Sequence, residues 1–344
     1  MTKQTHESAL LSRRMALATL AAMPLGLVPA ILAGQRSPLV LEEFLPECTA
    51  SLTACWHAMI EEEDFTTIAT QVPKYLPALE LLAQQPSRYQ KTAAHLTTQG
   101  YLLMYHVALG NLNLPLTQVY CRRAERYSRI AEDQALSLEV MTRLAYTFLD
   151  KSLSVYEKAL AILSDPHHQI SASLQHKIFM QAAACYAQNG QVQNALRCLE
   201  KTRETPLEQA HDEPIPSGCR IFSTLSWGAQ TYEYLGNVAL SQGLSKRPRV
   251  LYTAVHQTLT QVEKLDSTIL VPEHVRVEVI LHQAKTAIDL GEMDMFQMYF
   301  QTGAQRAKGL SGQRHKQAAI DNWKLARLRW PDEVVIKDLA DLLS

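Results

Sequence analysis

The sequence is poor in charge, in glycine and in proline. Charged residues make up 19% of the 344 residues, and 33 basic residues face 34 acidic ones, so the formal net charge is −1. A chain this close to neutral gives no whole-chain indication of nucleic-acid binding. With only 13 glycines and 15 prolines, a collagen-like or low-complexity chain is excluded. Leu and Ala together form about a quarter of the chain, which favours helices over disorder.

Cysteine is also scarce, and its six copies form no C-x-x-C motif. They are too few and too scattered for the disulfide framework of a small secreted protein. The two closest copies, Cys48 and Cys55, would lie roughly on one face of a helix. We therefore expect thiols buried among helices in a reducing compartment. The cysteines are Cys48, Cys55, Cys121, Cys185, Cys198 and Cys219.

Motifs of the common enzyme classes are missing as well. The sequence contains no G-x-x-x-x-G-K-[ST] phosphate loop, no G-x-S-x-G nucleophile elbow and no H-E-x-x-H metal motif. The adjacent histidines His167 and His168 follow Asp165-Pro166 and are typical of a polar turn between helices. We expect no catalytic residue, no cofactor and no metal ligand, and therefore a protein that is not an enzyme.

Residues 1–36 form a basic and apolar segment that allows three interpretations. Residues 15–35 carry no charge and are long enough to span a membrane. The two arginines before them also resemble part of an export signal. However, two prolines and a glycine interrupt the run, and a lone span tolerates such breaks poorly. We favour a linker helix docked on the helices that follow; the alternatives are a membrane anchor through about 15–33 and a cleaved export signal.

From residue 37 to residue 344 the apolar residues recur at every third or fourth position, which is the period of amphipathic helices. Helix-ending phrases also recur, each with a small or aliphatic residue seven positions before a glycine. The small residue lets a partner helix approach, and the glycine ends the helix in a left-handed conformation at low cost. A second helix then folds back antiparallel. The phrases end at Gly110, Gly190, Gly236 and Gly291.

One copy of this two-helix unit resembles the tetratricopeptide repeat in detail. Its aromatic, small and glycine positions follow the spacing of that repeat, and they are Phe179, Ala183, Tyr186, Gly190 and Ala195. The resemblance implies an all-α fold over 37–344, in which antiparallel helix pairs stack into a right-handed superhelix of about twelve to fourteen helices. Each pair leaves an apolar face that the next pair buries.

A wider resemblance covers most of the chain. Several segments are similar to the repeat-bearing C-terminal region of a family of bacterial helix-turn-helix (XRE-like) transcriptional regulators. These segments are LEEFLPECTASLTACWHAM (41–59), LAQQPSRYQKTAAHLTTQGY (82–101), YCRRAERYSRIAED (120–133) and ARLRWPDEVVIKDLADLL (326–343). In that family a DNA-binding domain precedes the repeats, and the residues before the apolar segment are too few for one. The resemblance implies a cytoplasmic sensor or scaffold part of a regulatory system, without the DNA-binding domain.

Charge is balanced in sum but clustered along the chain. Arginines recur on one predicted helix face, where Arg122, Arg126 and Arg129 are candidate contacts for anionic groups of a partner. Two further basic runs lie at 246–249 and 306–329. The ordinary interpretation of all three runs is a solvated helix face, and the functional alternative is a surface that meets another molecule.

The sequence thus predicts a non-enzymatic helical-repeat module that receives a peptide or protein in its groove. Its expected partners are that ligand, a separate DNA-binding protein and a second copy of the chain in a homodimer, without direct contact to nucleic acid. The alternative is a membrane-anchored or exported repeat adaptor. Whether residues 15–35 are inserted in a membrane discriminates between the module and the adaptor.

Overall fold

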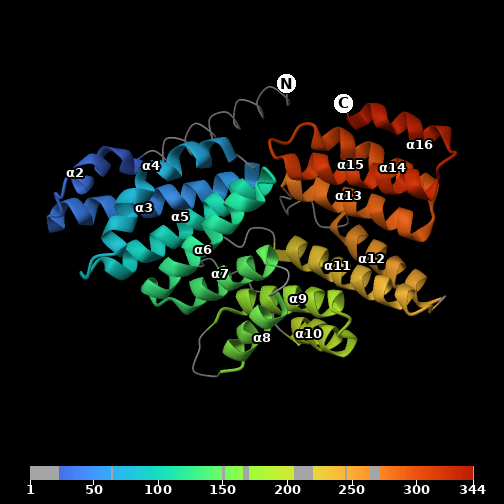
Figure 1. The fold of residues 1–344 in the computed structure, drawn as a ribbon, viewed down its shortest axis with the longest axis horizontal. Coiled ribbons are helices and arrows are strands. Elements are labelled where there is room, and N and C mark those ends of the chain that lie inside the picture. The colour runs from blue at the N-terminus through green and yellow to red at the C-terminus, as the bar shows by residue number, and fades with distance from the viewer. Residues whose placement is uncertain are drawn as a thin grey trace. The chain divides into compact units, whose positions relative to one another are not determined.

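The computed structural model describes residues 23–62, 65–148, 152–165, 170–204, 220–244, 246–263 and 272–343 (Figure 1). Within these ranges the chain forms the α-helices α2 to α16 and no strand, which confirms the predicted all-α class. Within each unit, helices that follow one another along the chain pack side by side, as α5 does with α6 and α11 with α12. The described residues form two compact units, one ending at Thr147 and one starting at Phe148. The predicted repeat region, 37–344, therefore extends over both units, and the first unit also includes the described residues before it.

The first unit is a stack of long helices around one apolar core. Its largest fully buried side chains are Trp56, Tyr75, Tyr105, Tyr127 and Phe44. The helices are α2 (Val28–Leu32), α3 (Pro38–His57), α4 (Phe65–Ala83), α5 (Gln90–Gly110), α6 (Leu114–Ala131) and α7 (Gln134–Thr147), with the short turns η1 (Met23–Gly26) and η2 (Ala58–Glu62).

Local sequence explains where two of these helices begin. The side chain of Ser37 accepts a hydrogen bond from the backbone N–H of Val40. Pro38 fits the first turn because a backbone N–H there would have no acceptor within the helix. Asn113 caps α6 in the same way, by accepting from the backbone N–H of Leu116 at 3.2 Å. Both starts follow rules that can be applied to the sequence alone.

The described part of the N-terminal apolar segment packs against the first unit. Val28 and Ile31 of α2 are buried in the core that α3, α4 and α5 share. This is the arrangement expected for a docked helix, whereas residues 15–22 lie outside the described ranges. No helix in the described part of the chain is both long and apolar enough to cross a membrane.

The second unit continues the pattern with shorter helices. Consecutive helices pair across short turns, most closely α9 with α10, α11 with α12, and α13 with α14. Phe296 and Phe300 are fully buried, and their rings stack at 5.2 Å between centroids. The helices are α8 (Ser152–Leu163), α9 (Ala172–Gln188), α10 (Val192–Glu204), α11 (Arg220–Ser241), α12 (Arg247–Glu263), α13 (Glu273–Leu290), α14 (Met293–Ala307), α15 (Gln313–Arg329) and α16 (Val334–Asp338), followed by η4 (Leu339–Leu343).

The α9–α10 pair carries the residues that resemble the tetratricopeptide repeat. Ala183, Tyr186 and Ala195 are buried, whereas Phe179 is half-buried. The fully buried alanines let the two helices lie close together, which is the role that the sequence pattern assigns to small residues.

Two of the four phrase-ending glycines are turn residues, as predicted. Gly190 follows α9 with φ +72°, and Gly291 follows α13 with φ +79°. Glycine adopts this left-handed conformation readily, whereas a residue with a Cβ adopts it only at a cost in conformational free energy. The prediction is confirmed at these two positions.

The prediction of a left-handed turn is wrong at the other two glycines. Gly110 is the last residue of α5, and Gly236 lies inside α11, so both have helical backbone. Each instead lies against an aromatic ring of the neighbouring helix. A Cβ at position 110 would overlap the ring of Phe65, and one at position 236 would lie 2.7 Å from Tyr252 Cε1. These glycines are therefore required for close packing rather than for chain reversal.

Other predictions concern cysteines and loops. The five described cysteines are buried and unpaired with one another, as expected, and Cys219 lies outside the described residues. The histidines His167 and His168 also lie outside them, as do residues 205–219 of the proline-rich stretch between α10 and α11.

Replacing Gly190 with Val is expected to lower the free energy of unfolding by about 1–3 kcal/mol, because a β-branched residue is strained at this positive φ. An added Cβ would meet nothing within 4 Å, so the cost is one of backbone strain and not of crowding. Urea unfolding of the purified chain measures it. Gly190→Asn is the control, since Asn tolerates the left-handed region, and it should lose much less stability. Equal stability of Gly190→Val and the wild type would contradict the assignment.

Candidate functional site

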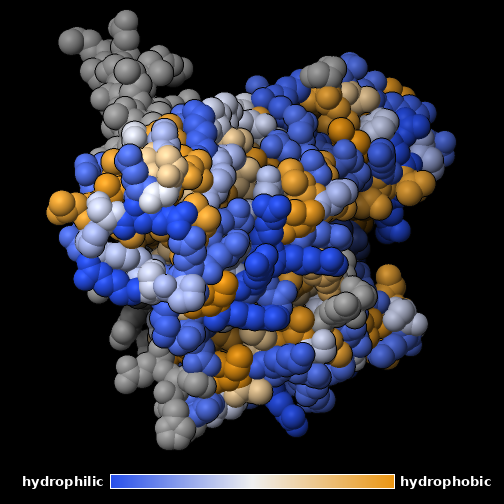
Figure 2. Space-filling view, turned by 60° about the vertical axis from the view of Figure 1, so that its left-hand side comes forward, coloured by the Kyte–Doolittle hydropathy of each residue, from blue (hydrophilic) through white to orange (hydrophobic). Residues whose placement is uncertain are grey.

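The predicted arginine site lies on α6 of the first unit. Arg122, Arg126 and Arg129 are all exposed there. The Arg126 guanidinium lies 5.6 Å from the centroid of the Tyr127 ring, and Arg129 forms an ion pair with Glu125 one turn away. The face shown in Figure 2 mixes hydrophilic side chains with small hydrophobic groups, as a solvated surface does.

A neighbouring arginine of α6, which the sequence pattern does not single out, belongs to a hydrogen-bonded cluster. The hydroxyl groups of Tyr101 and Tyr127 donate to Glu80 Oε1 at 2.6 Å and 2.9 Å, and Arg123 donates to the Tyr101 hydroxyl at 2.8 Å. Burial raises the pKa of the Tyr101 hydroxyl, so the group stays protonated and serves as a donor. Because these groups bind one another, the cluster stabilises the packing of α4, α5 and α6.

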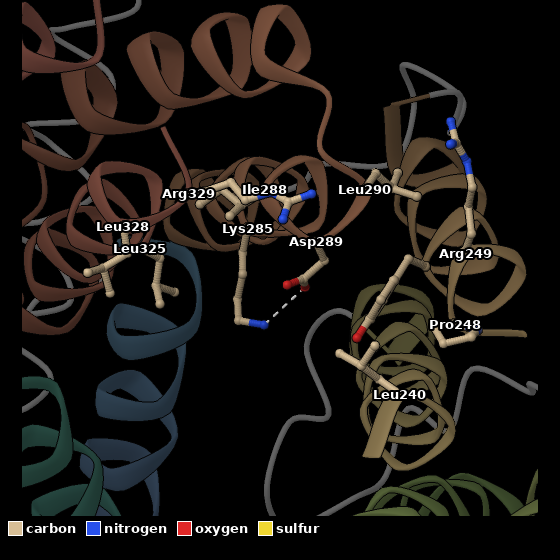
Figure 3. Close-up of a pocket in the computed structure, with 11 residues that line it drawn as sticks. Leu240, Pro248, Arg249, Lys285, Ile288, Asp289, Leu290, Leu325, Leu328 and Arg329 are labelled. Carbon is tan, nitrogen blue, oxygen red and sulfur yellow. Dashed lines mark hydrogen bonds and ion pairs between the residues drawn. The ribbon is translucent and has the colours of Figure 1, made fainter. Parts of the chain in front are cut away.

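The second unit contains an open pocket of about 620 Å³ between α11, α12, α13 and α15 (Figure 3). A volume of this size suits a drug-sized ligand or a few residues of peptide. Charged side chains occupy its centre, and apolar side chains flank them on two sides. The lining residues are Leu240, Pro248, Arg249, Tyr252, Lys285, Ile288, Asp289, Leu290, Leu325, Leu328 and Arg329.

Lys285 stands at the centre of a chain of ion pairs beside the pocket. Its Nζ donates to Glu233 Oε1 and lies 3.4 Å from Asp289 Oδ2. Glu233 is only 9% exposed, and its second oxygen lies 2.7 Å from Nε2 of His282. Lys285 and His282 thus compensate the cost of burying the Glu233 carboxylate.

The carboxylates of this network have opposite pKa shifts. Burial by itself would raise the pKa of Glu233, but the hydrogen bonds and charges of His282 and Lys285 lower it to about 2. Burial raises the pKa of Asp289, and the nearby Lys285 only partly opposes that effect. Glu233 is therefore the ionised anchor of Lys285, whereas Asp289 is the second carboxyl group beside Lys285 and lines the pocket.

One of the residues that line the pocket is aromatic. Tyr252 is buried, and its hydroxyl donates to Asn237 Oδ1 at 2.7 Å. Burial, followed by the charge of Asp289, raises the pKa of this hydroxyl to about 12. Its ring lies against Gly236, so the same glycine that packs α11 on α12 also fixes this wall of the pocket.

Two arginines lie at the rim of the pocket and differ in their ion-pair partners. Arg249 of α12 forms an ion pair of 3.0 Å with Glu292. Arg329, the last residue of α15, has no hydrogen-bond or ion-pair partner in the part of the chain that the structure describes. Its Nη2 would lie 3.1 Å from a Cβ at position 291, so the absence of a side chain on Gly291 leaves room for the guanidinium.

Three leucines that line the pocket are exposed, whereas Ile288 is buried. Leu328 is 80% exposed, Leu240 is 62% exposed and Leu325 is 40% exposed. Figure 3 places Leu325 and Leu328 on one side of Lys285 and Leu240 on the other. Exposed apolar side chains grouped around a concave surface are typical of a binding site.

Only part of this pocket is indicated by the sequence. Arg249 and Arg329 belong to the two basic runs at 246–249 and 306–329. No sequence pattern singles out Lys285 and Asp289, because their helix has no charge cluster of its own. In the described part of the chain no group of three or more His, Cys, Asp or Glu side chains is placed to hold a metal ion.

No protein-family model matches this sequence, and no curated protein matches it either. The interpretation of the pocket consequently depends on its shape, its charges and its exposed leucines.

Proposed function

We propose that this chain is a non-enzymatic binding module whose second unit receives a peptide segment of a partner protein in the pocket lined by α11, α12, α13 and α15. The observation that carries the proposal is the group of exposed leucines around a charged, open cavity. A small apolar ligand would favour an enclosed cavity, whereas an extended segment needs an open one with separate apolar contacts.

We further propose that the helix pairs form a tetratricopeptide-like superhelix. The short turns of the α9–α10 and α13–α14 pairs, each with a left-handed glycine, support it. So does the packing of α11 on both α9 and α12, since in a stack each pair contacts the next.

The resemblance to the bacterial regulators suggests the setting in which such a module works. In this proposal the chain is the sensor or scaffold part of a cytoplasmic regulatory system, and a separate protein binds the DNA. The segment that enters the pocket would then belong to that protein or to a signal that controls it. The formal net charge of −1 agrees with a role that involves no direct contact to nucleic acid.

An array of short synthetic peptides of randomised sequence tests the binding function. The labelled full-length chain is applied to the array, and the best peptides are measured in solution against the wild type and against Leu328→Glu. Because Leu328 is 80% exposed, the substitution should leave the fold intact, but it places a charge on the apolar wall. We expect a loss of affinity of about tenfold or more.

Met298→Glu is the matched control for this experiment. Met298 is 54% exposed on α14 of the same unit and does not line the pocket. The Met298→Glu substitution should therefore leave peptide affinity unchanged. An array without bound peptides, or peptides that bind both variants and the wild type equally well, would contradict the proposed function.

A further inference from the structure

We propose that the pocket selects a peptide carboxylate, which binds the guanidinium of Arg329, together with an aliphatic side chain that packs on Leu325 and Leu328. This inference rests on the proposed function and names the chemistry that the same pocket recognises.

Among the cations of the pocket, Arg329 is the one available to an incoming anion. Lys285 already binds Glu233 and Asp289, and Arg249 binds Glu292. Arg329 has neither a hydrogen-bond partner nor an ion-pair partner among the described residues. An arginine fork donates two parallel hydrogen bonds to a carboxylate, which gives both attraction and orientation.

The guanidinium of Arg329 lies beside the turn after α13. Gly291 ends that helix in a left-handed conformation, and the guanidinium lies against it where a Cβ would be tight. The C-terminus of a helix carries partial negative charge, which favours a cation beside it. The guanidinium is thus held at the rim of the pocket without an acidic partner among the residues that the structure describes.

The acidic groups near the pocket favour a carboxylate over a phosphate. Asp289 lines the pocket, and Glu292 lies at its rim. A phosphate carries close to two negative charges and would be repelled by both carboxylates more strongly than a singly charged group. A single guanidinium without a partner among the described residues matches a single carboxylate.

The aliphatic part of the ligand follows from the positions along α15. Leu328 and Arg329 follow Leu325 by three and four residues, so Leu325 has both as neighbours on the helix surface. Leu328 and Leu325 are 80% and 40% exposed, and covering them with an aliphatic side chain removes apolar surface from water. A ligand with a carboxylate next to a leucine-like side chain would satisfy both contacts.

The carboxylate can come from an acidic side chain or from the end of a peptide. The array therefore carries each sequence with a free and with an amidated carboxyl terminus, and with Asp and Glu replaced by Asn and Gln. If the terminus is the source, amidation abolishes binding; if a side chain is the source, the Asn or Gln replacement does so. Either result supports the inference.

Three variants of α15 complete the experiment. Arg329→Gln should weaken the best peptides by about tenfold or more, because a charge-assisted hydrogen bond is lost. Arg329→Lys keeps the charge but not the fork and should recover only part of the affinity. Arg327→Gln is the matched control, since Arg327 lies 5.8 Å from the centroid of the Trp323 ring and does not line the pocket.

The outcomes separate this inference from the proposed function. Peptides whose affinity depends on Leu328 but neither on their carboxylates nor on Arg329 would overturn the carboxylate inference and leave peptide binding in place. An array that binds no peptide would overturn the proposed function itself.

Discussion

Glu233→Ala is expected to lower the free energy of unfolding by about 3–5 kcal/mol, because it removes the shared acceptor of a buried network. The side chain is 12% exposed, and its two oxygens bind Lys285 and His282. Without Glu233, the Lys285 ammonium would keep Asp289, at 3.4 Å, as its one ion-pair partner among the described residues. Denaturant unfolding, followed by circular dichroism, measures the loss. A variant as stable as the wild type would show that the network contributes nothing to the fold.

The same network gives stability a defined dependence on pH. The pKa of Glu233 is about 2 in the folded chain, against the ordinary value of 4.5 that we take for the unfolded chain. A carboxyl group with a lowered folded pKa stabilises the protein above its unfolded pKa, and this stability is lost as pH falls from 4.5 to 2. The loss over that window amounts to about 3 kcal/mol.

The control for this pH dependence is Glu233→Gln. It keeps the size of the side chain but cannot ionise, so the component of the slope that Glu233 supplies between pH 4.5 and 2 should be absent. Asp289, whose pKa is raised by burial and also by the charge of Glu233, contributes a slope of the opposite sign in the wild type, and this opposing slope should be smaller in Glu233→Gln. The difference between wild type and variant is therefore the quantity to measure. Identical slopes would contradict the account of the ion pairs.

Gly110→Val is the second substitution with a large expected effect, a loss of about 3 kcal/mol. The glycine ends α5 in helical conformation, and the ring of Phe65 at the start of α4 occupies the space of its side chain. Phe65 is 9% exposed, so it has little room to move. Thermal or urea unfolding of the purified variant tests the prediction.

A double-mutant cycle identifies the cause. Phe65→Leu by itself removes buried apolar surface and should destabilise the first unit. Combined with Gly110→Val, however, the smaller side chain relieves the overlap, so the double variant should lose about 1–2 kcal/mol less than the sum of the two single losses. Strict additivity would mean that the ring is not what excludes a side chain at position 110.

The two kinds of glycine show how far the sequence could predict the fold. All four phrases have a small or aliphatic residue seven positions before the glycine, yet only Gly190 and Gly291 reverse the chain. A glycine at a close helix contact has the same sequence context as a turn glycine, because both follow a small or aliphatic residue on a packed face. At the end of α5 the left-handed residue is Leu112, with φ 57°, which no propensity rule favours. The helical class and the reversals at Gly190 and Gly291 were predictable, but the left-handed residues after α5 and α11, Leu112 and Gly243, were not.

The candidate site was less predictable than the fold for a geometric reason. Its residues come from α11, α12, α13 and α15, which are far apart in sequence, so they form no local motif. Arg122, Arg126 and Arg129 do stand out, because they repeat on a single helix, yet the structure places them on an exposed face of α6. Which arginine lacks a partner depends on tertiary contacts, and this is what distinguishes Arg329 from Arg249.

Photo-crosslinking of the best array peptide is the measurement that tests the central claim most directly. A photoreactive group replaces one side chain of the peptide, and mass spectrometry identifies the crosslinked residues of the full-length chain. The proposed function predicts adducts on the residues that line the pocket, at 240–252 and 285–329, and their loss in Leu328→Glu. Adducts concentrated on α6, or spread evenly over both units, would contradict it.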